Sequence, residues 1–265
     1  IISKRIPKVV IGCKDPFAMV AGRGIQKLRD AGIEVKVGVL ENECMQLIER
    51  FVTFHTKKRP FILLKWAESA DGFIDYQRTE GKPVLLSSPL TSMLVHKLRA
   101  EYSAILVGKR TALLDNPSLT TRNWYGKNPT RIVIDKDLSL PANLHLYNGE
   151  APTLVFTQAT QTPNYPQTEF VQLNFAEDIL PQIMEALYQR KLQSLMVEGG
   201  NYTLQSFIDA GLWDEVRIEV SPIHLKEGVR APQFPQKYIK LTKNVFGRNI
   251  KYAFKRDLSN ENEGK

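Results

Sequence analysis

Residues 61–72 read Phe61-Ile62-Leu63-Leu64-Lys65-Trp66-Ala67-Glu68-Ser69-Ala70-Asp71-Gly72, an apolar run that passes directly into a polar segment. Four consecutive apolar residues predict a strand buried on both faces, which is typical of a parallel sheet covered by helices. Open sheets of this kind bind ligands at the carboxyl ends of their strands. The segment from Lys65 to Gly72 is therefore predicted to form part of a site.

Two further segments have the same character. The first starts at Gly108, after the apolar run 104–107, and continues through Asp115 to Arg122. The second is Glu198-Gly199-Gly200-Asn201, which follows the apolar run 194–197. Because all three junctions follow strands of the same type, we expect them to meet in one site.

The rest of the chain repeats this alternation of strands and helices. Beyond the runs above, strands are predicted at 131–134, 153–156, 170–173 and 215–220, helices at 90–100, 178–191 and 202–210, and an antiparallel hairpin at 238–241 and 250–254. The predicted fold is an α/β fold with a mostly parallel sheet and an antiparallel C-terminal edge.

The first 58 residues form a separate pattern. A strand at 9–12, a helix at 24–31, a strand at 33–40 and a helix at 41–55 make a β-α-β-α piece. Two strands and two helices are too few to bury a core of their own. We therefore expect residues 1–58 to be the tail of a larger domain or an appendage, and residues 59–265 to be a complete domain.

Composition excludes several classes of function. The 265 residues carry a net charge of +8, but the charges are dispersed and are not interleaved with aromatic residues as in a single-strand nucleic-acid binder. No apolar run approaches the roughly 18 residues of a membrane span, and no signal peptide precedes the first strand. We expect a cytoplasmic protein that binds neither nucleic acid nor membrane.

Cys13 and Cys44 stand alone, which favours buried thiols over a disulfide or a zinc site.

Several residues at the junctions suit an anionic ligand. Gly199-Gly200 lets a ligand approach the backbone at a helix start, and Arg99 and Arg122 are candidate phosphate ligands. Lys65 ends an apolar strand, where a lysine is costly unless it has a partner or a chemical role. Each feature also has a plainer interpretation: an ordinary strand-to-helix turn, surface ion pairs, or, for Glu198, a salt bridge. The four histidines occur singly and indicate surface or hydrogen-bonded residues, not metal ligands.

Taken together, these motifs resemble the bifunctional riboflavin-biosynthesis enzymes (the RibD family), in which a zinc pyrimidine deaminase precedes a pyrimidine reductase. The segments Asp15–Gly24 and Leu28–Val35 resemble the end of the deaminase, which has a cytidine-deaminase-like fold. The segments Lys65–Gly72, Thr111–Arg122 and Val197–Gly200 resemble the reductase, which has the dihydrofolate-reductase-like fold. The deaminase motifs His-x-Glu and Pro-Cys-x-x-Cys are absent from the sequence, so we expect neither deamination nor a bound metal.

The resemblance implies NADPH-dependent reduction of the ribosyl side chain of 5-amino-6-(5-phosphoribosylamino)uracil to its ribityl form. For this reaction, our hypothesis is that Lys65 and Glu198 hold and protonate the pyrimidine-ribose end and that Arg99 and Arg122 bind the 5-phosphate. Backbone groups near Leu119 are also expected to contact substrate. The residues that match the family's cofactor contacts are Ala67, Thr111, Asp115, Gly200, Asn201, Tyr202, Thr203, Leu204, Gln205 and Ser206. It also favours a homodimer through the reductase part.

The sequence departs from the family pattern at two places. Pro83 stands where the family usually has a serine that contacts substrate, and we expect Ser87 to take over that contact. Lys136 replaces a small polar residue near the cofactor and is predicted to pair with the 2′-phosphate of NADPH. Two alternatives stay open: a dihydrofolate- or pteridine-type reductase on the same fold, and a non-catalytic binding or regulatory module.

Overall fold

The computed structural model describes residues 1–15 and 22–255, and the chain divides into two compact units. The first unit is Ile1–Phe61 with Leu187–Gln193, and the second is Ile62–Ala186 with Ser194–Lys265. Residues 16–21 of the Asp15–Gly24 segment, which carries part of the resemblance to a deaminase, lie outside the described residues. The division into functional domains at residues 58 and 59 stays a prediction.

The first unit contains a two-stranded parallel sheet of β1 (Lys8–Ile11) and β2 (Glu34–Val37), with helix α1 (Arg23–Asp30) between them in the chain. The helix predicted at 41–55 is two helices, α2 (Glu41–Leu47) and α3 (Glu49–Lys57), because the backbone leaves the helical conformation at Ile48. Cys13 and Cys44 are half-buried, so the prediction of buried thiols is wrong. Two strands shield too little surface to bury them fully.

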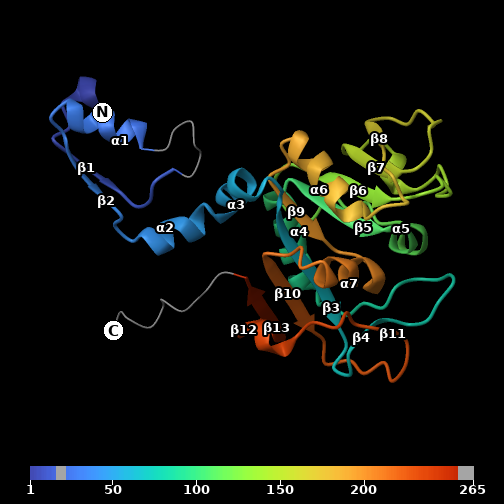
Figure 1. The fold of residues 1–265 in the computed structure, drawn as a ribbon. Helices are drawn as coiled ribbons and strands as arrows, with labels where there is room; N and C mark the ends of the chain where they lie inside the picture. Colours follow the sequence, from blue (N-terminus) through green and yellow to red (C-terminus); the bar gives the residue numbers. More distant parts are fainter. Residues whose placement is uncertain (16–21, 256–265) are drawn as a thin grey trace. The chain divides into compact units, whose positions relative to one another are not determined.

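A nine-stranded sheet forms the centre of the second unit. Its strand order is β12-β13-β10-β3-β9-β5-β6-β7-β8, with the C-terminal strands at one end and β7 and β8 at the other (Figure 1). The strands are β3 (Phe61–Glu68), β5 (Ala104–Gly108), β6 (Thr130–Ile134), β7 (Thr153–Thr157), β8 (Thr168–Gln172), β9 (Ser194–Val197), β10 (Glu215–Val220), β12 (Ile239–Val245) and β13 (Arg248–Phe254).

The pairing confirms the predicted fold class. β5 pairs in parallel with β6 and β9, β6 with β7, β7 with β8, and β10 with β3. β13 pairs antiparallel with β10 and β12, and its hairpin turns at Phe246 and Gly247, which both have positive φ. β5 is buried at every position, and residues 62–64, 104–106 and 195–197 are fully buried, as expected for apolar strand segments covered on both faces.

Four helices accompany this sheet: α4 (Pro89–Glu101), α5 (Lys109–Asp115), α6 (Ile179–Gln189) and α7 (Asn201–Asp209). The predicted start of α4 is confirmed, since Ser88 caps it and forms a capping box with Thr91. Helix α5 was not predicted. It spans only seven residues, which is too short for a helical apolar period to stand out.

The strand predicted at 61–64 continues to Glu68, so Lys65 lies inside β3 and not at its end. Its neighbour β10 pairs with it from Leu63 to Glu68, which extends the strand beyond the apolar run. Side chains alternate between the faces of a strand, so Lys65 and Ala67 share one face of the sheet. A second sheet of β4 (Phe73–Asp75) and β11 (Val229–Arg230) was also not predicted, because its strands are too short to show a pattern.

The loop after β3 is held by Asp71. Its carboxylate accepts hydrogen bonds from Ser69 Oγ at 2.6 Å and from the backbone nitrogens of Leu225 and Lys226 at 3.1 and 2.7 Å. These bonds, the one from Ser69 first, lower the pKa of Asp71 to about 2 from its ordinary 3.8. The carboxylate therefore ties two loops of the second unit together in its ionised form.

As the pH falls from 3.8 toward 2, we expect the free energy of unfolding to decrease less in the Asp71→Asn variant than in wild type. The variant lacks the carboxyl whose pKa differs between the folded and the unfolded state. The folded pKa lies below the unfolded one, so the contribution of Asp71 to stability is complete above 3.8 and disappears as the pH falls toward 2. Urea unfolding followed by tryptophan fluorescence measures this effect, because Trp66, Trp124 and Trp213 all belong to the second unit. Asp137→Asn, at an exposed position, is the control; equal acid sensitivity in wild type and Asp71→Asn would contradict the assignment.

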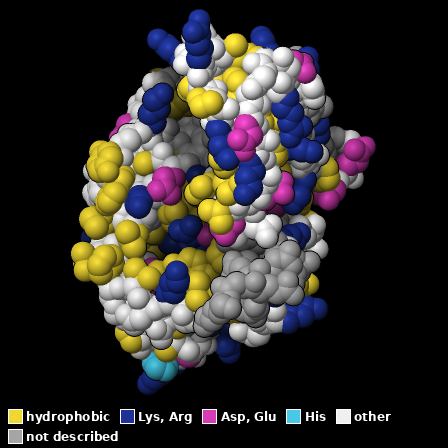
Figure 2. Space-filling view, turned by 90° about the vertical axis from the view of Figure 1, so that its left-hand side faces the viewer, with side chains coloured by type: hydrophobic (Ala, Val, Ile, Leu, Met, Phe, Trp, Pro, Cys, Tyr) yellow, Lys and Arg dark blue, Asp and Glu magenta, His cyan; other side chains and the backbone are white. Residues whose placement is uncertain are grey.

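On the face of the molecule shown in Figure 2, lysine and arginine side chains are scattered among acidic, apolar and uncharged ones. Within residues 1–15 and 22–255, none of the helices combines the length and the apolar character that crossing a bilayer requires. The expected location in the cytoplasm and the expected lack of nucleic-acid and membrane partners stay predictions.

Candidate active site

The three predicted junctions belong to neighbouring strands. β3, β9 and β5 follow one another in the sheet, so Lys65, Glu198 and Gly108 come from adjacent positions across it. Helix α4 adds His96 and Arg99, and the segment after α5 adds residues 116–122. The strand order, which no single segment specifies, brings these parts of the chain together.

Lys65, Arg99 and Glu198 form a buried charged cluster. Arg99 Nη2 donates to Glu198 Oε2 at 2.8 Å, and Lys65 Nζ lies 3.7 Å from Glu198 Oε1. The three side chains are only 14%, 12% and 8% exposed, in chain order, so their charges are little screened by water. Each oxygen of the carboxylate thus faces its own cation.

The cluster keeps Glu198 ionised. Burial by itself would raise the pKa of this carboxyl, but the charges of Arg99 and Lys65 and the hydrogen bond from Arg99 outweigh burial and lower the pKa. An ionised carboxylate accepts hydrogen bonds and has no proton to give. In this cluster, the candidate proton donor is the ammonium group of Lys65, because the guanidinium of Arg99 does not give up its proton.

The segment 116–122 places a free cation beside the cluster. Leu119 is 2% exposed and has a φ of 54°, and the carbonyl of Thr120 accepts from Arg99 Nη1 at 3.3 Å. Arg122, two residues further on, is exposed, and its side chain makes no hydrogen bond or ion pair with the described part of the chain. Arg122 is therefore available to an anion, whereas Arg99 is already engaged by Glu198.

Glycines bring the turns after β5 and β9 into contact. A Cβ at Gly108 would lie 2.3 Å from Thr203 Oγ1, and a Cβ at Gly199 would lie 3.0 Å from Val107 Cβ. A Cβ at Gly200 would lie 3.2 Å from Thr111 Oγ1, and the φ of Gly200 is +66°. Larger residues would push these turns apart. Because the N-cap of α7 is this glycine, the N–H groups of the first turn are offered to a ligand instead of a side-chain cap.

The side chains at the start of α7 are mostly occupied by the protein itself. Asn201 donates to the carbonyl of Arg230 at 2.9 Å, Gln205 accepts from Gln233 N at 2.7 Å, and Ser206 donates to the carbonyl of Tyr202. Leu204 is buried, and Tyr202 is exposed. Any contact of Asn201 or Leu204 with a cofactor is therefore expected through the backbone.

The remaining predicted residues have different surroundings. Ser87 donates to Glu219 Oε2 at 2.7 Å, which uses the hydroxyl proton expected for substrate. Asp115 forms an ion pair with Arg78. Lys136 lies over the ring of Phe175, with Nζ 5.9 Å from the ring centroid, and its pairing with a 2′-phosphate stays a prediction.

Sequence reasoning missed three residues of this region. Arg78 binds both Asp75 and Asp115, Glu219 is buried between Ser87 and Thr91, and His96 is buried beside Arg99. None belongs to one of the three junctions. The one signal was the position of His96, a single turn before Arg99 on the same helix.

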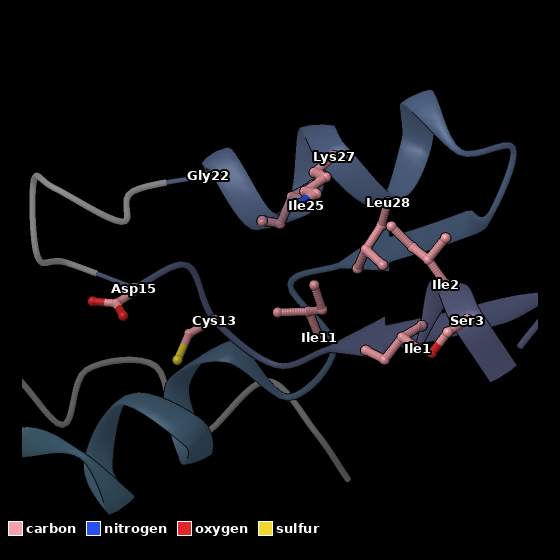
Figure 3. A pocket seen from close by; sticks show the side chains of 11 residues that line it. Ile1, Ile2, Ser3, Ile11, Cys13, Asp15, Gly22, Ile25, Lys27 and Leu28 are labelled. Atoms are coloured by element: carbon pink, nitrogen blue, oxygen red, sulfur yellow. The ribbon is translucent and has the colours of Figure 1, made fainter.

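A cavity of about 860 Å³ lies in the first unit, and none of the site residues described above lines it. Its lining is mainly apolar, with Ile2, Ile11, Ile25 and Leu28 pointing into it from α1, β1 and the N-terminus (Figure 3). A two-stranded sheet with one short helix leaves such a face uncovered.

Within the described residues, no three His, Cys, Asp or Glu side chains gather as metal ligands, and the expected lack of a metal stays a prediction.

Comparison with known proteins assigns the family. The model of the RibD C-terminal domain matches residues 60–244, which include every strand and helix of the site. The chain belongs to the RibD C-terminal domain family. The fold is accordingly the dihydrofolate-reductase-like one expected from the motifs.

Relatives of known name support this assignment. The riboflavin biosynthesis protein RibD of Aquifex aeolicus is 37% identical over 233 residues, which are 86% of this chain and 65% of that protein. The RibD protein of Synechocystis is 37% identical over 237 residues, 88% of this chain and 64% of that protein. This chain therefore spans about two thirds, or slightly less, of the length of these relatives.

A solved structure extends the similarity to both units. A diaminohydroxyphosphoribosylaminopyrimidine deaminase/5-amino-6-(5-phosphoribosylamino)uracil reductase from Thermotoga maritima matches 96% of this chain and 72% of its own length, with 33% identity and a TM-score of 0.85. Since 96% of the chain is covered, residues of the first unit are included in the match.

Proposed function

We propose that this RibD-family chain catalyses the NADPH-dependent reduction of the ribosyl side chain of 5-amino-6-(5-phosphoribosylamino)uracil to the ribitylamino form. One observation carries the proposal: Lys65 of β3 and Arg99 of α4 both face Glu198, which directly precedes the glycine-lined turn that begins α7. A reductase needs a proton donor and a cofactor site side by side, and these elements supply both.

Lys65 is proposed as the proton donor. Reduction of an opened sugar adds a hydride to the carbon of its C=N or C=O group and a proton to the nitrogen or oxygen. The ammonium of Lys65 can donate that proton, while ionised Glu198 orients Lys65 and accepts hydrogen bonds from the substrate. This differs from the first expectation, in which Glu198 shared the role of proton donor.

The turns after β5 and β9 are proposed to hold NADPH, which supplies the hydride when bound. The close approach of Gly108 to Thr203 and of Gly200 to Thr111 holds these two turns against each other. The N–H groups at the start of α7 suit its diphosphate. Lys136 is proposed to favour NADPH over NADH, and a homodimer through the second unit is expected as well.

The test is oxidation of NADPH by the protein in the presence of the phosphorylated pyrimidine, its dephosphorylated counterpart or dihydrofolate. Rapid oxidation only with the phosphorylated pyrimidine supports the proposal. Preference for dihydrofolate would favour a pteridine-type reductase. Absence of turnover with all three, combined with measurable nucleotide binding, would favour a binding module.

Arg122→Ala is expected to raise the KM for the phosphorylated pyrimidine about 10- to 100-fold, because a charged hydrogen bond to phosphate is lost. The kcat should change little, since Arg122 lies outside the cluster of Lys65 and Glu198. Steady-state kinetics measure both constants, and Lys127→Ala, an exposed cation five residues away, is the matched control. An unchanged KM in Arg122→Ala would remove this residue from phosphate binding.

A further inference from the structure

His96 is a buried group that the proposed chemistry does not use. It lies on α4, one turn before Arg99, and is only 4% exposed. Its Nδ1 is 2.9 Å from the carbonyl oxygen of Thr120. A carbonyl can only accept a hydrogen bond, so Nδ1 carries the proton and donates it.

The carbonyl of Thr120 receives two donors from α4. Besides His96 Nδ1, it accepts from Arg99 Nη1 at 3.3 Å, and the other terminal nitrogen of Arg99 binds Glu198. His96 thus helps to fix the one backbone oxygen that connects the segment 116–122 with the charged cluster. Thr120 itself is 1% exposed, so this carbonyl has no water to replace a lost donor.

The segment held in this way is strained and carries the free cation. Leu119, next to Thr120, has a φ of 54°, a conformation that L-residues other than Asn, Asp and Gly rarely adopt. The segment has further anchors at its ends, where Ser118 O accepts from Arg131 and Thr121 N donates to Asn128. Between these anchors, His96 and Arg99 hold the turn that places Arg122.

Burial and the neighbouring arginines favour the neutral form of the His96 imidazole. Burial, then Arg99 on its own helix and Arg122 on the facing segment, lower its pKa, against the opposing influence of Thr120 O and of Glu198 at the end of β9. A neutral imidazole donates a hydrogen bond without adding another positive charge beside these arginines. This property distinguishes it from a lysine or an arginine at the same place.

We propose that His96 is a positioning residue that acts through the carbonyl of Thr120 to hold Leu119 and Arg122 where the phosphate of the substrate binds. The role rests on the proposed function, since it presupposes a phosphorylated ligand at Arg122. In this role, His96 affects the affinity for the phosphorylated ligand and does not affect the proton transfer from Lys65.

Three substitutions test this role. The amide nitrogen of His96→Asn can replace Nδ1, whereas His96→Gln places its amide nearer the position of Nε2 and His96→Phe has no donor. We expect the KM for the phosphorylated pyrimidine to rise about tenfold in His96→Phe and His96→Gln and to stay within about threefold of wild type in His96→Asn. The kcat and the KM for NADPH should stay close to wild type. His224→Phe, at an exposed position, is the control.

Binding of inorganic phosphate, measured by calorimetry, gives a readout without turnover and should follow the same order among the variants. If wild type binds phosphate in this His96-dependent way but does not reduce the pyrimidine, the proposed function fails and the positioning role stands. If wild type reduces the pyrimidine and all three variants match it, the positioning role is wrong. Equal losses in His96→Asn and His96→Gln, or a wild type that binds no phosphate, would also overturn it.

Discussion

Replacing Lys65 with methionine is expected to lower kcat by about 10²- to 10⁴-fold, the usual contribution of a positioned general acid. Methionine keeps the length and the apolar stem of lysine but has no proton to donate. Arg99 still faces Glu198 at 2.8 Å in this variant, so the carboxylate is not left unpaired. The KM for NADPH should change little, because the turns that are proposed to hold it do not involve Lys65.

Single-turnover kinetics with saturating NADPH and substrate measure this loss directly. Lys97→Met is the matched control, because Lys97 is a half-exposed lysine on α4 that pairs with Glu101 at 3.9 Å, outside the cluster. A kcat in Lys65→Met within about tenfold of wild type would show that another group supplies the proton, since even the lower end of the expected effect is 10²-fold.

The second large effect concerns stability. Arg131 is completely buried, and the five N–H groups of its guanidinium share six acceptors within hydrogen-bond distance: Thr153 Oγ1, Asn148 Oδ1 and the carbonyls of Ser118, His145, Leu146 and Ala151. Burial lowers the pKa of this arginine, and the nearby charge of Glu150 opposes that effect. Its hydrogen bonds therefore compensate much of the cost of burying the charge.

Arg131→Met is expected to lower the free energy of unfolding by about 3 kcal/mol or more, because several buried carbonyls lose their donor together. Denaturant unfolding followed by tryptophan fluorescence measures the second unit, which contains all three tryptophans. Lys240→Met, at an exposed position of β12, should change stability by less than about 0.5 kcal/mol. A loss below about 1 kcal/mol in Arg131→Met would mean that water reaches these carbonyls.

Strands were predictable from the sequence because their signal is local. The nine strands predicted in residues 59–265 are all present, since apolar runs such as 62–64 and 104–107 are long enough to be recognised. The errors occurred where local signals are weak. β3 is extended by its neighbours, α5 is too short to show a period, and Ile48 divides one predicted helix into two.

The candidate site was predictable only as separate segments. Lys65, Glu198 and the glycines after β9 follow recognisable apolar runs, and the combination of motifs led to the family. Arg99, expected to bind phosphate, pairs with Glu198, and Ser87, expected to contact substrate, donates to Glu219; both ligand contacts stay predictions. In each case the nearest partner lies on a distant segment, which a local pattern cannot indicate.

The strand segments, the polar residues that follow them and the family resemblance could all be obtained from the order of the residues alone. Only the tertiary structure decided which charged and polar groups meet: Arg99 with Glu198, His96 with the carbonyl of Thr120, and Arg78 with Asp115, which are 99, 24 and 37 residues apart. The physical reason is that apolar periodicity is a property of neighbouring residues. Contacts between charges depend instead on strand order and register, which the burial of the whole sheet selects.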